Sequence, residues 1–189
     1  MAKASAAPAT IAIVCGLGNP DADYERTRHN AGFATVDVLA ARHWKSEAGA
    51  QVASLTWRGA DGEQREVLLA KPMSYMNTSG GPLSKLARAH RVAPQQILVV
   101  HDEVDLAAGE VRLKLGGGLN AHNGLRSIAD KLGSRDFARV QFGIGRPPGK
   151  MQVADYVLRE LKGGFLDEFN ITAERAADLV ERILTEGAK

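Results

Sequence analysis

One histidine stands in a polar stretch where it could exchange a proton with water. His29 lies within residues 27–32 (TRHNAG), between a glycine-rich turn at residues 16–20 (GLGNP) and an apolar helical pattern that begins near Ala31. Imidazole has the side-chain pKa nearest neutrality, so it can take and return a proton at working pH. Because most histidines only pack or face solvent, a catalytic base at His29 depends on which polar groups join it.

Further polar side chains follow stretches that look buried, and each of them alone is more often structural than functional. They are Asn19, Asn30, Asn77, Asp102, His122 and Asn123. Ligands of open α/β sheets collect beyond the carboxyl ends of strands, and Asp102 follows the apolar run 97–100 at such an end. Together these amides and imidazoles predict a polar pocket that suits an ester or peptide backbone and an oxyanion.

Other kinds of site are less well supported. The GLGNP turn lacks the third glycine of the dinucleotide fingerprint, where Asp21 stands, and about ten polar residues follow it instead of a helix. The acidic segment at His101-Asp102-Glu103 has no histidine or cysteine partners at metal-ligand spacing, so we expect neither a metal nor another cofactor. No serine occurs in a GxSxG elbow. The single cysteine, Cys15, excludes an internal disulfide and is expected in the core.

Strand and helix patterns alternate along the chain. Apolar or alternating runs predict strands at residues 11–14, 52–57, 66–70, 97–100, 111–115 and 139–144. Asp61-Gly62 is a hairpin signal between the second and third of these strands. Helical spacing predicts helices at residues 31–43, 82–90, 125–132 and 153–158, and a last amphipathic helix around 173–183. The order predicts a single three-layer α/β domain with a mixed β-sheet flanked by helices.

Length and composition agree with one globular domain. The chain has 189 residues, which suits a single domain at 10–189, and its net charge of +2 permits a polyanionic partner without arguing for one. No apolar run reaches the roughly 18 residues of a membrane span. Residues 1–9 are small and polar without the apolar core of a secretory signal, so we expect a disordered N-terminal tail on a cytoplasmic protein.

Four segments in register resemble the bacterial peptidyl-tRNA hydrolase family. They are GLGNP with YERTRHNAG, KPMSYMNTSG, VVHDEVDLAAGEVRLKLGGG and HNGLRSI, within about residues 11–150. Members of this family hydrolyse the ester that joins a peptide to the terminal ribose of tRNA, which recycles tRNA from abandoned translation. The resemblance implies a single α/β domain with a twisted mixed sheet, no metal, peptidyl-tRNA as the partner, and a monomeric cytoplasmic enzyme.

The resemblance also implies roles for individual residues. His29 matches the general base that deprotonates water, and Asp102 matches the carboxylate that orients this imidazole. The implied substrate contacts are Asn19, Tyr24, Met76, Asn77, His122 and Asn123. Lys114 matches a family lysine that contacts a tRNA phosphate, and Arg139, Arg146 and Lys150 are expected to support it as further phosphate contacts.

Strand alternation supports the basic contacts only in part. In the strand at 111–115, Val111, Leu113 and Leu115 are expected to face the core, which leaves Arg112 and Lys114 on the other face. The arginine that usually partners this lysine falls at Gln141. Arg139 is two residues away on the same strand face, so it is expected to substitute. A merely solvated strand face remains an equal alternative.

Besides Gln141, the chain departs from the family pattern at two further places. The glycine loop, usually GGGHGGHNG, has Leu119-Asn120-Ala121 instead of His-Gly-Gly, and Asp21 replaces the glycine that usually follows GNP. A side chain at Ala121 would restrict the approach of a substrate to the backbone. Plant organelle relatives use this fold in RNA splicing, so a non-catalytic RNA-binding protein is the alternative. The catalytic positions are kept, which favours an active enzyme.

Overall fold

The structure is a computed structural model that describes residues 9–40 and 43–189, so the predicted tail lies almost wholly outside the described residues. Within these ranges one seven-stranded sheet has the order β2-β3-β4-β1-β5-β7-β6. The central strands β4, β1, β5 and β7 run parallel, whereas β2, β3 and β6 are antiparallel to their neighbours. The strands are β1 (Ile13–Gly16), β2 (Lys45–Glu47), β3 (Ala50–Arg58), β4 (Gln64–Pro72), β5 (Ile97–Glu103), β6 (Val111–Leu115) and β7 (Ala138–Gly143).

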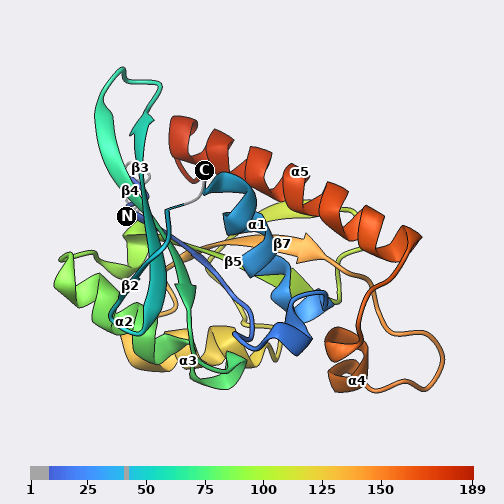
Figure 1. Cartoon of the computed structure of the whole chain (residues 1–189). Coiled ribbons are helices and arrows are strands. Elements are labelled where there is room, and N and C mark those ends of the chain that lie inside the picture. Colours follow the sequence, from blue (N-terminus) through green and yellow to red (C-terminus); the bar gives the residue numbers. More distant parts are fainter. Residues whose placement is uncertain (1–8, 41–42) are drawn as a thin grey trace, which may run out of the picture.

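Helices cover both faces of the sheet. The α-helices are α1 (Ala31–Leu39), α2 (Gly80–Ala89), α3 (Asn123–Leu132), α4 (Val153–Leu158) and α5 (Gly164–Glu186), and short 3-10 turns are η1 (Ala22–Tyr24), η2 (Arg28–Asn30), η3 (Met76–Thr78) and η4 (Pro94–Gln96). Helices α1 and α5 lie on one face and α2 and α3 on the other (Figure 1). Each face buries its own apolar cluster against the sheet. The predicted three-layer α/β domain with a mixed sheet is confirmed.

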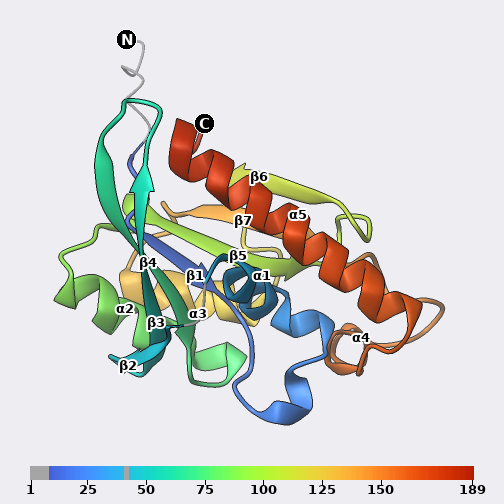
Figure 2. The ribbon, with the colours of Figure 1, turned by 45° about the horizontal axis from the view of Figure 1, so that its top comes forward.

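Several local predictions need correction. The first predicted helix, at residues 31–43, ends at Leu39, because Ala40 has an extended backbone. The strand predicted at residues 97–100 continues to Glu103, so Asp102 belongs to the end of β5. Leu115 was expected in the core but is 53% exposed, since it ends the edge strand β6. In Figure 2, α5 runs across one face of the sheet, and the tip of the β3–β4 hairpin protrudes beyond the rest of the sheet.

A close backbone contact places the start of α1 against the central strands. A Cβ atom on Gly32 would lie 2.1 Å from the backbone nitrogen of Leu17 and 2.3 Å from the carbonyl oxygen of Val100. Such distances are shorter than van der Waals contact, so only glycine fits. The glycine therefore brings the short turn that holds His29 next to the end of β5.

Candidate active site

His29 and Asp102 form a hydrogen-bonded pair although 73 positions separate them in the sequence. His29 lies in η2 and Asp102 near the end of β5. The Nδ1 atom of His29 is 3.0 Å from each carboxylate oxygen of Asp102. The side chains are 17% and 3% exposed, respectively, so the carboxylate is enclosed while the imidazole still reaches the surface.

His122, which follows Asp102 by 20 positions in the sequence, binds the same carboxylate. Its Nε2 atom is 2.9 Å from Oδ1 of Asp102, and its Nδ1 atom accepts the backbone N–H groups of Gly124 and Leu125. A ring nitrogen that accepts a hydrogen bond carries no proton, so the proton of neutral His122 is assigned to Nε2. Asp102 thus accepts one N–H from each of the two imidazoles.

The protonation states follow from these contacts. Burial alone would raise the pKa of Asp102, but attraction to His29 and His122 and their hydrogen bonds outweigh it and hold this pKa well below its ordinary value. Burial alone would lower the pKa of His29, but the charge of Asp102 and its hydrogen bond raise it above its ordinary value. Because Nδ1 of His29 donates to an ionised carboxylate, the free lone pair of the neutral imidazole is on Nε2.

A neighbouring histidine supports this pair from within the sheet. His101 is 1% exposed, and its Nδ1 atom donates to the backbone carbonyl of Asp102 at 2.7 Å. Burial, with His122 nearby, lowers the pKa of His101 to about 3, so it stays neutral. Sequence reasoning did not single out His101 as a site residue. Its position directly before Asp102, at the end of an apolar run, was the signal that could have indicated a role in the site.

Asn19 is tied by hydrogen bonds to Asn30, the residue that follows His29. Its backbone N–H donates to Oδ1 of Asn30, and its carbonyl accepts Nδ2 of Asn30, both at 2.9 Å. The side-chain oxygen of Asn19 accepts the backbone N–H of Met76 at 2.8 Å. Within the described residues its Nδ2 group makes no hydrogen bond, so this amide presents donors only. Asn30, in contrast, uses its side chain to hold the turn.

The other expected substrate residues have different surroundings. Asn77, in η3, and Asn123, the first residue of α3, are exposed, and Tyr24 is half-buried in η1. Met76 is buried and packs closely on α3, where a Cβ atom on Gly124 would lie 2.6 Å from its sulfur. The amides thus lie at the surface, whereas Met76 mainly supports the wall beneath them.

Arg139 does not occupy the position expected of a phosphate contact. Its side chain is buried, and its guanidinium donates to the carbonyls of Gly118, at 2.8 Å, and Gly116. This burial argues against the predicted phosphate contact, because the glycine loop covers the strand face and accepts hydrogen bonds from both terminal nitrogens of Arg139. Arg139 does lie beside Lys114 of β6, as strand alternation predicts. Strand alternation cannot predict that the glycine loop covers Arg139.

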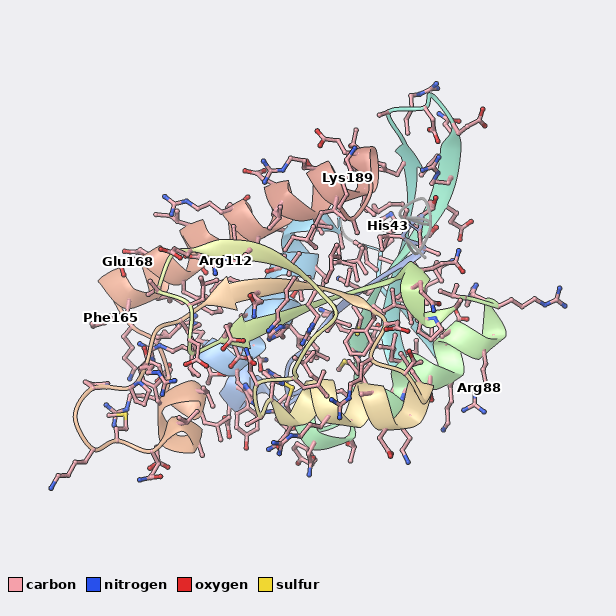
Figure 3. The ribbon with its side chains drawn as sticks, turned by 180° about the vertical axis from the view of Figure 1, so that it is seen from behind. His43, Arg88, Arg112, Phe165, Glu168 and Lys189 are labelled. Atoms are coloured by element: carbon pink, nitrogen blue, oxygen red, sulfur yellow. The ribbon has the colours of Figure 1, made fainter. Side chains whose placement is uncertain are left out.

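The other predicted basic residues are accessible. Lys114 is half-buried on β6 and lines a pocket of about 260 Å³ together with Arg112 and Gln141. Arg112 projects from this edge strand in Figure 3. Arg146 is exposed and pairs with Asp105, and Lys150 is exposed in the segment between β7 and α4.

One cluster has the residue types of a metal site. Across the described part of the chain, His29, Asp102 and His122 are the only three such residues whose ligand atoms lie within 4.8 Å of one another. The same nitrogen atoms already hydrogen-bond to Asp102, so a metal would have to displace both bonds. In this structure the three side chains therefore form a hydrogen-bonded set.

The fold and the site together define a class of protein, an α/β protein in which a buried carboxylate near the carboxyl end of a central strand binds two histidines. The profile of the family described as "Peptidyl-tRNA hydrolase" matches residues 13–189. The peptidyl-tRNA hydrolase of Nocardia farcinica is 50% identical, over 93% of this chain and 91% of its own. That of Frankia alni is 48% identical, over 93% and 88%. The crystal structure of peptidyl-tRNA hydrolase from Acinetobacter baumannii matches with a TM-score of 0.83 and 33% identity, over 95% and 91% of the two chains. This chain belongs to the peptidyl-tRNA hydrolase family.

Proposed function

We propose that this chain hydrolyses the ester bond between the peptide and the tRNA in peptidyl-tRNA, and so recycles tRNA from abandoned translation. The observation that carries the proposal is the hydrogen bond from His29 to the buried carboxylate of Asp102. Family membership supports the reaction, and the pair supplies the base and orienting acid that direct attack by water requires.

The reaction begins at Nε2 of His29, which takes a proton from water as the oxygen attacks the ester carbonyl. Asp102 holds the imidazole by Nδ1 and stabilises the imidazolium that forms. Collapse of the tetrahedral intermediate breaks the bond to the ribose oxygen, and His29 returns its proton to that oxygen. The products are a peptide carboxylic acid and tRNA. General-base assistance of this kind typically contributes about 10²–10⁴ in rate.

Amide groups are suited to the negative oxygen of the intermediate. The Nδ2 group of Asn19 is the best candidate, because its own oxygen is occupied by the backbone of Met76. The exposed amides of Asn77 and Asn123 would bind the ester and the attacking water. Each preorganised donor of this type is typically worth about 10²–10³ in kcat. Tyr24 and Met76 would border the peptide.

The tRNA would be bound through its phosphates by Lys114, Arg146 and Lys150, which are the predicted basic residues that remain accessible. We further propose that the chain acts as a monomer in the cytoplasm. No helix in the described ranges is long and apolar enough to cross a membrane. A sedimentation measurement with and without tRNA tests the monomer directly, since a dimer would double the mass.

A hydrolysis assay separates this proposal from a non-catalytic RNA-binding role. The unmutated protein should release labelled peptide from peptidyl-tRNA, and His29→Ala should abolish release while tRNA binding stays within a few-fold. Tight tRNA binding without turnover by the unmutated protein would support the RNA-binding alternative instead. Undiminished hydrolysis by His29→Ala would exclude His29 as the base.

A further inference from the structure

A buried carboxylate next to the site gathers three N–H donors. Glu103, the last residue of β5, is 4% exposed. Its Oε1 atom accepts the backbone N–H of Asp105 at 3.0 Å, and its Oε2 atom accepts both Nδ2 of Asn120 at 2.9 Å and Nε2 of Gln141 at 3.0 Å. We call Glu103, Asn120 and Gln141 the Glu103 clamp. It joins two sheet strands to the glycine loop.

The loop that the clamp holds has a strained backbone. Asn120 and Ala121 have φ angles of 48° and 59°, in the left-handed region that disfavours residues with a Cβ atom. Other contacts restrain the same loop, because Arg139 binds its glycine carbonyls and Leu119 is buried in the core beside α3. The clamp adds the attachment closest to the active site.

The loop leads directly into the catalytic residues. Two residues after Asn120, His122 donates to Asp102, and Asn123 then begins α3. A shift of the loop would therefore first lengthen the hydrogen bond between His122 and Asp102. It would reach His29, the proposed base, only through Asp102. Asn120 and Gln141 both stand where the chain departs from the family pattern, and they meet at one oxygen atom.

We propose that Glu103 is a positioning residue, which holds the glycine loop through Asn120 so that His122 and Asn123 keep their places in the active site. Gln141 fixes the orientation of the Glu103 carboxylate from β7. This inference rests on the proposed function, because the loop matters only if Asp102 and His29 act on peptidyl-tRNA.

Loss of the clamp has a distinct electrostatic consequence. The groups that face Asp102 are the imidazoles of His29 and His122 and, through the backbone, that of His101. If the bond from His122 weakens, more of the negative charge of Asp102 acts on His29, which stabilises its imidazolium. The pKa of His29 should then rise, whereas a general loss of structure would expose His29 and bring this pKa back toward its ordinary value.

The decisive comparison uses two neighbouring residues. Asn120→Gly removes the clamp donor, and Ala121→Gly gives the backbone the same freedom but leaves the clamp intact. Glycine suits the positive φ at both positions, so both variants should fold. We expect Asn120→Gly to lower kcat about tenfold with KM within about twofold, as loss of a hydrogen bond to a charged group implies. Ala121→Gly should keep kcat within about twofold, because the hydrogen bond from Asn120 to Glu103 remains; easier approach of the substrate to the backbone would change KM instead.

A second variant pair and an NMR titration complete the test. Glu103→Gln should behave like Asn120→Gly, while Glu110→Gln, at an exposed carboxylate, should not. Titration of the His29 imidazole by NMR should show its pKa about half a pH unit higher in Asn120→Gly than in the unmutated protein. Equal losses of kcat in Asn120→Gly and Ala121→Gly, or an unchanged pKa of His29, would overturn the inference. Because the titration needs no substrate, its result is independent of whether the unmutated protein hydrolyses peptidyl-tRNA.

Discussion

Replacing Asp102 by asparagine removes the charge of the site but keeps the shape of the side chain. The carboxylate now accepts two N–H groups, from Nδ1 of His29 at 3.0 Å and from Nε2 of His122 at 2.9 Å. An asparagine has a single acceptor oxygen and an NH₂ group that only donates. One of the two imidazoles must therefore lose its acceptor.

The contacts of His122 determine which of the two imidazoles loses its hydrogen-bond acceptor. Its Nδ1 atom is fixed as an acceptor by two backbone N–H groups at the start of α3, so its Nε2–H must keep an acceptor. The asparagine oxygen would then turn toward His122, and the NH₂ group would face His29. Nδ1 of His29 must become the acceptor, which moves its proton to Nε2. The lone pair that takes a proton from water is lost, so we expect kcat to fall by the full general-base contribution, about 10²–10⁴.

The same substitution should move the pH profile. In the unmutated protein the charge of Asp102 raises the pKa of His29. Without this charge the burial of His29, which is the largest influence on it, dominates and lowers the pKa. The acid limb of kcat/KM, where activity falls as His29 becomes protonated, should therefore move to lower pH in Asp102→Asn.

The assay is release of labelled peptide from peptidyl-tRNA between about pH 5 and pH 8, where histidine titrates. Asp136→Asn, at an exposed carboxylate before β7, serves as the matched control and should retain the rate and profile of the unmutated protein. A loss of less than about fivefold in Asp102→Asn, or an acid limb that stays in place, would refute the proposed tautomer and the role of the charge.

Three further predictions concern stability and tRNA binding. Gly80→Ala should lower the free energy of unfolding in urea by several kcal/mol, because the new Cβ would lie 2.1 Å from the backbone of α3. The control Gly81→Ala meets nothing within 4 Å, so it should be neutral or stabilise the fold by up to about 1 kcal/mol. Lys114→Ala should make the log–log salt dependence of tRNA affinity shallower by about 0.7–0.9. The control Lys162→Ala, at an exposed lysine that pairs with Glu160, should leave the slope unchanged. Equal slopes in Lys114→Ala and the unmutated protein would indicate that Lys114 only faces solvent. Asp102 has a lowered pKa in the folded state, so it stabilises the fold above the ordinary carboxyl pKa and this stabilisation is lost as pH falls. The difference in melting temperature between the unmutated protein and Asp102→Asn should therefore shrink below about pH 4, and a constant difference would contradict the shift.

Local patterns were sufficient for most of the architecture. Apolar and alternating runs locate every strand of the sheet except β2, whose three residues are all exposed. Asp61-Gly62 locates the turn between β3 and β4, because turn geometry acts within a few residues. The end of α1 at Leu39 was missed, since helical spacing of apolar residues continues past the point where the backbone becomes extended. The extension of β5 to Glu103 was also missed, because charged residues rarely indicate a buried strand.

The candidate site was predictable only as a set of residue types. Sequence reasoning placed Asp102 at the carboxyl end of a strand and singled out His29, but nothing in their local surroundings says that they meet. Their contact depends on Gly32, whose missing side chain lets α1 approach β1 and β5 closely. The tautomer of His122 depends likewise on the backbone at the start of α3. Both are properties of packing between distant segments.

Arg139 shows most clearly how a loop changes the meaning of a strand residue. Alternation places it on the same face as Lys114, and on an open sheet both would meet solvent. The glycine loop instead folds over this face, and its carbonyl groups, which have no strand partners, need donors. Arg139 supplies them from below, while Glu103 holds the loop through Asn120. Two buried charges of opposite sign thus bind the loop, and the more accessible Lys114 remains the proposed contact with a phosphate.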